Sequence, residues 1–299
     1  MSTKHVSRTE EMLGTVIEIK VPENFSHVFS ECFGEIKRIE NAYSRFLGNS
    51  ELSKLNSTLG KWQHISDEFI FLLEQAKHFN KLTNGNFDIT LKSVLDRLGY
   101  DKDYSFVEKK EKRAQILGDK FAVFLSPIKI DKKGKKVFLR KQIDFGGFGK
   151  GFALDRVASI LNENKVKSYY IDAGGDIFAK QDKEPWEILL EHPDDTKNAI
   201  GKISLNGNAI AGSSSNRRKW NNNHHLINAK TKMPQNSVKA IFVIAKSGIE
   251  ADAYSTALFT AGFEEGIILA MELGISALII SNENKMYKSE GFEAEIFSD

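Results

Sequence analysis

The sequence predicts an α+β protein with mixed or antiparallel sheets. Strand-like and helix-like segments alternate along the 299 residues, but the regular strand–helix–strand repeat of a parallel sheet is absent from the sequence. The pair Asn206-Gly207 between two short apolar segments is typical of a tight hairpin, which joins antiparallel strands. The composition, 41% hydrophobic and 27% charged, allows a sizeable core. We find no linker or low-complexity segment, so we treat residues 1–299 as one domain. This domain could consist of two lobes around a cleft.

Hydropathy and capping residues predict the elements of the N-terminal half. Leu13–Lys20 alternates between apolar and polar residues, as a strand with one buried face does. Ser26–Tyr43 has apolar residues at helical spacing, and the single cysteine, Cys32, falls on that face, where we expect it in the core. Ser66, followed by two acidic residues, predicts the start of a second helix, which Gly85 is expected to end.

The C-terminal half is expected to hold mostly strands. Phe121–Leu125 and Val137–Phe145 have the apolar content of strands, and a turn is expected around Gly134. Ile203–Ala211 contains the expected hairpin. Val238–Ala245 is nearly all apolar, which predicts a buried strand leading into a further helix.

Net charge and hydropathy exclude several classes of protein. The formal net charge of +2 argues against nucleic acid as the main partner. The basic segments Lys109–Lys112 and Lys132–Lys136 are short, which suits a solvated helix face and a turn. No stretch of the sequence is long and apolar enough to span a membrane. Met1–His5 lacks the apolar part of a signal peptide, so we expect a cytoplasmic protein, or a periplasmic one whose export segment has been removed.

Asp252 and Thr256 are candidates for a metal site. If their segment is helical, these two residues, four apart, lie on one face of the helix. That face then offers a carboxylate and a hydroxyl, which are hard oxygen donors suited to Mg²⁺. In the alternative, Asp252 caps or electrostatically favours a helix N-terminus and Thr256 simply follows.

A glycine-rich turn, Asp144–Gly151, leads from an expected strand into an expected helix. Such a turn presents backbone N–H groups and the positive end of the helix dipole to an anion, and Lys150 could add its charge beside a phosphate. The segment fits neither the P-loop, which needs Ser or Thr after the lysine, nor the dinucleotide-binding pattern. A turn that is rich in glycine only for close packing is the alternative.

The histidines give a weaker indication. None of the seven stands four residues from another histidine or from the cysteine. His224 and His225 follow a polar asparagine segment, and a histidine in such a loop is usually solvated. The sequence also lacks the Gly-x-Ser-x-Gly pattern, so serine hydrolase chemistry has no support.

Several short segments follow one another in an informative order. They are Leu13-Gly14-Thr15, Ser44-Arg45-Phe46, Ser50–Asn56, Gly85–Thr90, Asp144–Gly151, Asp172–Asp176, His224–Ile227 and Asp252–Leu258. Each is similar to a motif of the ApbE-like family of FAD:protein FMN transferases. The chain resembles that family over nearly its whole length.

The resemblance implies a T-fold-like architecture and an Mg²⁺-dependent enzyme. Such an enzyme moves FMN from FAD, its substrate, to a threonine or serine hydroxyl of an acceptor flavoprotein and releases AMP. The resemblance makes Asp252, Thr256 and the backbone carbonyl of Gly147 the expected metal ligands. His225 would orient a phosphate or manage the acceptor proton, which makes it, with Asp252, a catalytic candidate.

The resemblance also implies which residues contact FAD. Asp144 and Lys150 would contact FAD or its phosphates, while other residues would line the flavin or adenosine pocket. The full set expected to bind FAD is Leu13, Phe46, Asn86, Phe87, Asp88, Asp144, Lys150 and His225.

Two departures from the family pattern affect rate and acceptor choice more than fold. Ser213–Ser215 stands where the family tends to have Thr-Ser-Gly, and Asn228–Lys232 stands where it has Asp-Pro-x-Thr-Gly. Losing glycine at Lys232 and Ser215 removes easy access to positive φ. Losing the aspartate removes a charge.

The acceptor is expected to be a separate protein. The family modifies the last residue of a short string similar to Ser/Thr-Gly-Ala-Ser/Thr, and this sequence contains no such string. We therefore expect transfer to another flavoprotein and no stable self-modification. Two other hypotheses are a FAD pyrophosphatase, in which water replaces the acceptor hydroxyl, and a non-catalytic FAD-binding protein.

Overall fold

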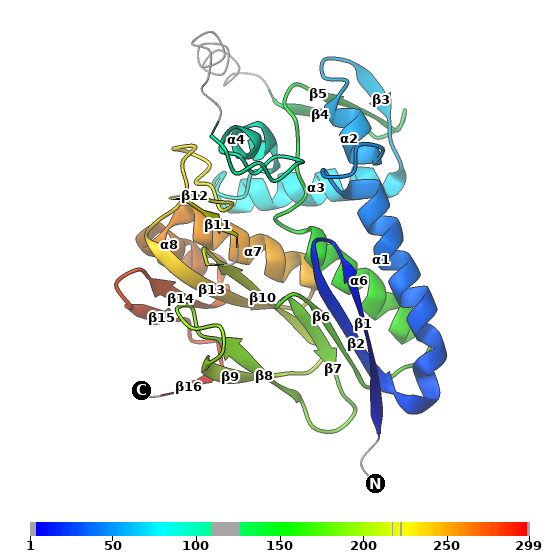
Figure 1. The fold of residues 1–299 in the computed structure, drawn as a ribbon, viewed down its shortest axis with the longest axis vertical. Coiled ribbons are helices and arrows are strands. Elements are labelled where there is room, and N and C mark those ends of the chain that lie inside the picture. Colours follow the sequence, from blue (N-terminus) through cyan, green and yellow to red (C-terminus); the bar gives the residue numbers. More distant parts are fainter. Residues whose placement is uncertain (1–3, 109–125, 217, 222, 298–299) are drawn as a thin grey trace. The chain divides into compact units, whose positions relative to one another are not determined.

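The computed structural model describes residues 4–108, 126–216, 218–221 and 223–297 (Figure 1). The chain forms two compact units. Unit 1 comprises Met1–Glu40, Gly146–Arg218 and Gln235–Asp299, and unit 2 comprises Asn41–Phe145 and Lys219–Pro234. The expected strand Phe121–Leu125 and the basic segment Lys109–Lys112 lie outside the described residues. None of the described helices is long and apolar enough to cross a membrane.

Unit 1 is built on two antiparallel sheets. Its larger sheet has, within the described residues, the strand order β1-β2-β6-β7-β10-β13-β14-β15. These strands are β1 (His5–Met12), β2 (Thr15–Pro22), β6 (Tyr169–Ala173), β7 (Ile177–Lys180), β10 (Asn208–Ser214), β13 (Val238–Ala245), β14 (Ser276–Ser281) and β15 (Met286–Lys288). The smaller sheet has the order β16-β9-β8 and consists of β8 (Trp186–Glu191), β9 (Ala199–Leu205) and β16 (Ala294–Ile296). All these pairings are antiparallel, so the predicted α+β class is confirmed.

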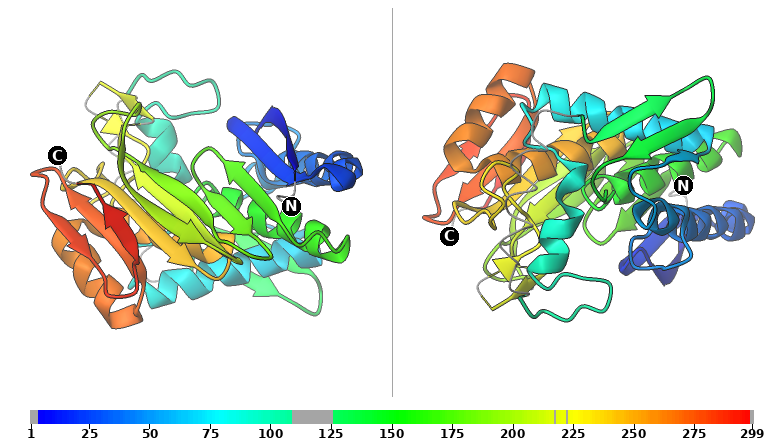
Figure 2. Two further views of the ribbon diagram at one scale, coloured as in Figure 1. Left: turned by 90° about the horizontal axis from the view of Figure 1, so that it is seen from below. Right: turned by 90° about the horizontal axis from the view of Figure 1, so that it is seen from above.

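Helices cover one face of the larger sheet, and the smaller sheet packs on the other face (Figures 1 and 2). The helices are the 3₁₀ turn η1 (Glu23–Val28), α1 (Phe29–Tyr43, whose last residues belong to unit 2), α6 (Gly149–Glu163), α7 (Gly248–Ala261) and α8 (Phe263–Leu273). Buried residues of α1, α6, β2 and β6 form one apolar core. A second core lies between the two sheets. The predicted helix over Ser26–Tyr43 and the predicted buried strand over Val238–Ala245 are thus confirmed within a few residues.

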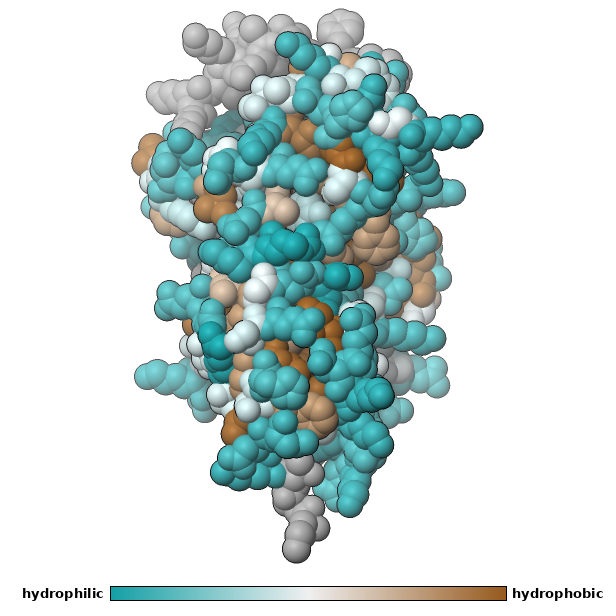
Figure 3. All heavy atoms as spheres, turned by 90° about the vertical axis from the view of Figure 1, so that its right-hand side faces the viewer, coloured by the Kyte–Doolittle hydropathy of each residue, from teal (hydrophilic) through white to brown (hydrophobic). Residues whose placement is uncertain are grey.

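Cys32 lies in the first of these cores, as its spacing predicts. Its side chain is fully buried, and burial raises the pKa of the Cys32 thiol to about 12. The surface drawn in Figure 3 is largely hydrophilic, with hydrophobic residues only in small patches. The apolar content of the sequence has therefore gone mainly into the cores.

Unit 2 combines short helices with a small sheet. Its helices are α2 (Glu51–Asn56), α3 (Asp67–Leu82), the 3₁₀ turn η2 (Ile89–Leu91) and α4 (Lys92–Arg97). Its described strands are β3 (Trp62–His64), β4 (Ile128–Asp131) and β5 (Lys136–Leu139) in one sheet, and β11 (Lys219–Trp220) with β12 (Asn223–His224) in another. Ser66 caps α3, since its side chain accepts the N–H of Phe69, so the predicted helix start is confirmed. The predicted turn at Gly134 joins β4 to β5.

The prediction of a strand beginning at Leu13 is wrong at its start. Leu13 and Gly14 form a two-residue turn, with φ of +55° and +69°, that joins β1 to β2. Positive φ at both positions is what the right-handed twist of paired strands requires of such a turn. Alternation of hydropathy alone does not reveal this turn, because Leu13 continues the apolar pattern of the strand after it.

The predicted hairpin at Asn206-Gly207 is also wrong in its pairing. The turn is present, with Gly207 at a φ of +78°, but the strands on either side belong to different sheets. β9 pairs with β8 and β16, whereas β10 pairs with β7 and β13. The N–H of Gly207 donates to the carbonyl of Ala179 at 2.7 Å, so the turn connects the two layers.

The predicted strand Val137–Phe145 ends early, at Leu139. The backbone around Ile143 pairs with a side chain in place of a neighbouring strand. Asn56 Oδ1 accepts the N–H of Ile143 at 2.8 Å, and Asn56 Nδ2 donates to the Ile143 carbonyl at 2.8 Å. One amide side chain therefore satisfies both backbone groups of a buried residue.

Candidate active site

α7 carries two of the three expected metal ligands. Ser247 caps this helix, because its Oγ accepts the N–H of Glu250. Asp252 lies beyond the cap, inside the helix, and is only 3% exposed. Thr256 follows about one turn later, so the two side chains share a face, as their spacing predicts. Asp252 therefore does not cap α7. The alternative, in which it favours a helix N-terminus, is met at α6, because Asp252 accepts the N–H of Gly151.

Gly147, the third expected ligand, lies next to Thr256. The Thr256 hydroxyl donates a hydrogen bond to the Gly147 carbonyl oxygen, with 3.2 Å between the oxygens. This contact joins two segments that are 109 residues apart in the sequence. The structure thus brings the two neutral candidate ligands together, one helical turn from the Asp252 carboxylate.

α6 and α7 touch each other where both helices begin. A Cβ atom built on Gly151 would lie 2.1 Å from the carbonyl oxygen of Gly248, and one built on Gly248 would lie 2.4 Å from that of Gly151. No side chain fits in that space, so both positions need glycine. The N–H of Gly151 donates to Oδ2 of Asp252 at 3.0 Å. Gly151 therefore allows close packing of the two helices, which is the alternative explanation for the glycine-rich turn.

Lys150 contacts carboxylates in this structure. Its ammonium group contacts Asp176 and lies 3.6 Å from Oδ1 of Asp252. Burial acts to lower the pKa of Lys150, but the two carboxylates outweigh it and hold that pKa above its usual value. Two carboxylates and one ammonium meet here, and the Arg218 guanidinium is close enough to lower the pKa of Lys150 in part.

Asp176 is the site residue to which the sequence assigned no role. It is 2% exposed, and its Oδ1 accepts the N–H of Gly212 at 3.1 Å. Burial raises the pKa of Asp176 although Lys150 acts to lower it, and the nearby Asp252 carboxylate raises it further. The one signal in the sequence is the Asp172–Asp176 segment, which is similar to a family motif.

These donors fit a magnesium ion. A carboxylate, a hydroxyl and a backbone carbonyl are hard oxygen ligands, and Mg²⁺ usually binds through one or two carboxylates together with water and phosphate oxygens. The described residues contain no group of three or more His, Cys, Asp or Glu side chains that could hold a metal by themselves. A site with a single carboxylate suits a cation that arrives with a phosphate-bearing substrate.

Ser213, in the first departure from the family pattern, packs against α7. Its Oγ lies 3.0 Å from Oγ of Ser255, which in turn donates to the Asp252 carbonyl at 3.0 Å. These contacts link β10 to the helical turn that carries Asp252. Ser215 is not among the described residues with positive φ. Contrary to the expectation from the sequence, the loss of glycine at this position therefore does not strain the backbone.

Leu13, an expected FAD contact, lies at the turn between β1 and β2. Its N–H donates to Oε1 of Glu40 at 2.7 Å, and its side chain packs against the core of α1 and α6. The glutamate thereby ties the hairpin turn to α1. The contact of Leu13 with FAD remains a prediction.

In unit 2, aromatic rings surround Arg45. Phe46 stacks on Tyr104, with 4.8 Å between ring centroids and 10° between ring planes. The Arg45 guanidinium lies 4.7 Å from the Phe46 ring centroid and 4.8 Å from that of Tyr100. His225 lies beside Tyr100, 6.1 Å between centroids. Two expected FAD contacts, Phe46 and His225, thus belong to one aromatic group, whose tyrosines the sequence did not single out.

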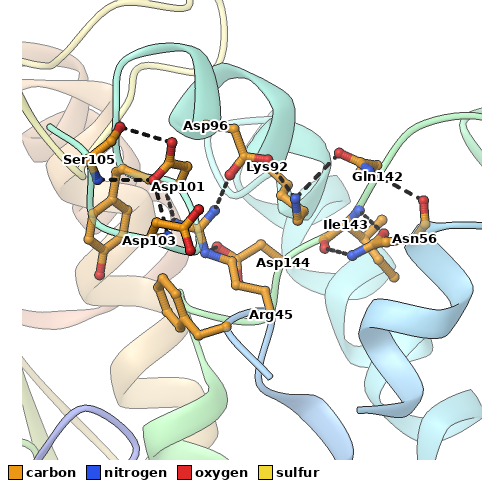
Figure 4. A network of polar contacts seen from close by, with 12 residues as sticks. Arg45, Asn56, Lys92, Asp96, Asp101, Asp103, Ser105, Gln142, Ile143 and Asp144 are labelled. Atoms are coloured by element: carbon orange, nitrogen blue, oxygen red, sulfur yellow. Dashed lines mark hydrogen bonds and ion pairs between the residues drawn. The ribbon is translucent and has the colours of Figure 1, made fainter. Parts of the chain in front are cut away.

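Asp144 belongs to a polar network in unit 2 (Figure 4). Its Oδ2 lies 3.3 Å from Nε of Arg45, whose side chain is 2% exposed. The same guanidinium donates to Oδ1 of Asp96 at 3.1 Å and to the Tyr100 carbonyl at 2.6 Å. A buried arginine with three acceptors holds the start of the glycine-rich turn in place.

Asn86, Phe87 and Asp88 occupy a structured turn in unit 2. Asn86 and Phe87 are 1% and 2% exposed, and the Phe87 ring lies edge-on to Phe79 of α3, 5.7 Å between centroids. Asp88 caps η2, with Oδ1 accepting both the N–H and the hydroxyl of Thr90 at 2.8 Å. Phe87 is a core residue here, and the contacts of this segment with FAD remain a prediction.

The second departure from the family pattern does place a lysine at positive φ. Lys232 has a φ of +60°, and its ammonium lies 3.7 Å from Oδ2 of Asp88. Asn228 stabilises the preceding turn, since its Oδ1 accepts the N–H groups of Lys230 and Thr231 at 2.9 Å. The departure therefore costs backbone strain and puts a cation beside an expected FAD contact.

Comparison with known proteins agrees with this arrangement. The model of the ApbE family matches residues 13–279. A FAD:protein FMN transferase of Haemophilus influenzae is 28% identical, over 94% of this chain and 88% of its own length. One of Buchnera aphidicola subsp. Schizaphis graminum is 26% identical, over 96% of this chain and 88% of its own. The crystal structure of the ApbE protein of Thermotoga maritima superposes with a TM-score of 0.88 at 27% identity, covering 97% of this chain and 98% of that one. The chain belongs to the ApbE family.

Proposed function

We propose that this chain is an Mg²⁺-dependent FAD:protein FMN transferase. The observation that carries the proposal is the placement of three oxygen donors. Thr256 binds the Gly147 carbonyl one helical turn from Asp252, whose carboxylate binds the Gly151 N–H and lies 3.6 Å from Lys150. Three oxygen donors beside an ammonium suit a divalent cation and a diphosphate together. The relatives named above supply the reaction class.

Each residue at the start of α6 and α7 has a proposed role. Asp252, Thr256 and the Gly147 carbonyl would hold Mg²⁺, which when bound neutralises charge on phosphoryl oxygens. Lys150 would exchange part of its pairing with Asp176 for contact with a phosphate of FAD. The N–H of Gly151 keeps the Asp252 carboxylate oriented by binding one of its oxygens.

The transfer breaks one phosphorus–oxygen bond of FAD and forms another with the acceptor. The hydroxyl oxygen of an acceptor serine or threonine attacks the phosphorus on the FMN side of the diphosphate and forms a new phosphate ester. The bond from that phosphorus to the bridging oxygen breaks, and AMP leaves with that oxygen and the bonding electrons. The acceptor hydroxyl loses its proton, and we propose His225 either as the group that manages this proton or as one that orients a phosphate.

We propose that the remaining residues bind FAD itself. Aromatic rings can stack on a flavin or an adenine, and Phe46 belongs to a group that already stacks rings face to face. The other proposed contacts are Leu13, Asn86, Phe87, Asp88 and Asp144.

One incubation separates this function from its alternatives. Purified protein is mixed with FAD and Mg²⁺, with and without an acceptor flavoprotein that carries a Ser/Thr-Gly-Ala-Ser/Thr string. A transferase adds the mass of FMN to the acceptor and releases AMP. A FAD pyrophosphatase frees FMN and AMP without an acceptor, and a non-catalytic binder leaves FAD intact. Chelation of Mg²⁺ is expected to stop the reaction.

The same experiment tests whether the acceptor is a separate protein. We expect no FMN adduct on this chain after long incubation, and we expect its bound flavin to be released on denaturation. Intact mass spectrometry gives the answer. A stoichiometric FMN adduct on this chain would mean that the acceptor lies within it.

A further inference from the structure

The two helices that meet at the candidate active site cap each other. α7 supplies Asp252, whose Oδ2 accepts the N–H of Gly151, the third residue of α6. α6 supplies Asp155, whose Oδ1 accepts the N–H of Gly248 at 2.6 Å and whose Oδ2 accepts that of Ile249 at 2.9 Å. The N–H groups of a first helical turn have no partner within their own helix, and a negative charge near them is favourable.

Asp155 completes the capping of α7. The first three N–H groups of this helix belong to Gly248, Ile249 and Glu250. Ser247 accepts only the third, so the first two depend on Asp155. A carboxylate offers an oxygen to each, whereas a carboxamide has a single oxygen acceptor.

We propose that Asp155 is a positioning residue for the metal site, because it holds the first turn of α7 against α6 and so determines where the Asp252 carboxylate lies. This inference rests on the proposed metal role of Asp252. The Gly151–Gly248 contact leaves no space between the helices, so the first turn of α7 has one position as long as its N–H groups stay bound. Asp252 begins the next turn, so its position is determined by that of the first turn.

Burial and the N–H groups of α7 act in opposite directions on the charge of Asp155. Burial raises the pKa of Asp155 to about 6, although the N–H groups of Ile249 and Gly248 lower it; Glu250 adds to the increase. Between its ordinary value of 3.8 and about 6 the folded state therefore binds more protons than the unfolded state. The free energy of unfolding contributed by Asp155 falls as pH rises through this window, so at neutral pH the ionised group costs stability.

The Asp155→Asn variant is therefore expected to change metal affinity more than stability. The variant buries no charge but leaves one of the two N–H groups without an acceptor, so its urea midpoint at pH 7 should stay close to that of the wild type. It should nevertheless bind metal about fivefold more weakly, less than the loss of a direct hydrogen-bond partner of a ligand usually causes, because Asp155 acts through the backbone of α7. Mg²⁺ for half-maximal turnover should rise by the same factor, with the saturated rate little changed. A residue with only a structural role would not separate these quantities.

The experiment titrates Mn²⁺, as a paramagnetic substitute for Mg²⁺, into the full chain with saturating FAD and no acceptor, and follows it by electron paramagnetic resonance. Wild type, Asp155→Asn, Asp252→Asn and Glu35→Gln are compared. Glu35 is the matched control, because its carboxylate accepts a bond from Arg156, the neighbour of Asp155 in α6, but does not touch α7.

The outcomes distinguish this inference from the proposed function. Weaker Mn²⁺ binding in Asp155→Asn, with wild-type binding in Glu35→Gln and no loss of stability, supports positioning. Wild-type Mn²⁺ affinity in Asp155→Asn, when Asp252→Asn has lost binding, overturns the inference and leaves the metal site standing. Unchanged binding in Asp252→Asn, or no binding by the wild type, overturns both.

Discussion

Gly151→Ala is the sharpest test of how α6 and α7 meet. The new Cβ would lie 2.1 Å from the carbonyl oxygen of Gly248 and 2.4 Å from its carbonyl carbon, both backbone atoms. Backbone cannot rotate out of the way as a side chain can. The two helices must therefore move apart, or the start of one must unwind.

The size of the effect follows from these distances. Real Cβ atoms essentially never come closer than 3.0 Å to such atoms, so the helices must separate by about 0.9 Å. Overpacking of this kind costs about 1–3 kcal/mol. A similar shift would lengthen the 3.0 Å bond from the Gly151 N–H to Asp252 beyond hydrogen-bond range and leave a buried carboxylate short of a donor. We expect a total loss of about 3 kcal/mol in the free energy of unfolding, together with weaker metal binding.

Gly149→Ala is the matched control for this prediction. Gly149 is the first residue of the same helix, and a Cβ built on it has nothing within 4 Å. Alanine there should change the free energy of unfolding by less than about 0.5 kcal/mol. Urea denaturation of both variants, followed by circular dichroism, measures the difference. If Gly151→Ala proves as stable as Gly149→Ala, the described crossing of α6 and α7 is wrong.

Four further predictions test individual residues. Asp252→Asn should abolish turnover at limiting Mg²⁺ in an AMP-release assay with acceptor present while the chain stays folded, whereas Asp252→Ala should also lose about 1–3 kcal/mol in urea denaturation, because the Gly151 N–H loses its acceptor. Lys150→Ala should weaken FAD binding about tenfold or more in a fluorescence titration, and added salt should weaken the wild type in the same direction; unchanged affinity would remove Lys150 from the FAD site. Lys232→Gly should raise the free energy of unfolding by about 1 kcal/mol, because glycine adopts a φ of +60° without strain, and a lower urea midpoint would contradict this. Cys32, fully buried with its pKa raised to about 12, should resist iodoacetamide in the native protein and react in denaturant, as counted by mass spectrometry; rapid native labelling would contradict its burial.

Local features of the fold were predictable from the sequence. Ser66 and the apolar residues after it predict α3, and the apolar run Val238–Ala245 predicts a buried strand, because these signals act within a few residues of the chain. The shared face of Asp252 and Thr256 needs only the geometry of one helix. Membership of the ApbE family was likewise predictable, since it depends on the order of short motifs.

Partners that are distant in sequence were not predictable. Asn206-Gly207 predicts a turn, yet nothing within the turn says that β9 and β10 belong to different sheets. The sequence around Ile143 is typical of a strand. In the structure, however, its backbone groups bond the side chain of Asn56, 87 residues away. Tyr100 gave no signal, although its carbonyl binds the buried Arg45.

The sequence by itself therefore determined the residue types at the site and the local geometry that carries them. It placed a carboxylate and a hydroxyl one helical turn apart and a glycine-rich turn before a second helix. Only the tertiary structure decided that the Gly147 carbonyl meets Thr256, that Asp155 caps the helix of Asp252, and that Asp176 shares Lys150. The physical reason is that these contacts arise from the packing of α6 against α7 and the sheet. That packing depends on how the whole core is filled, and no local propensity encodes it.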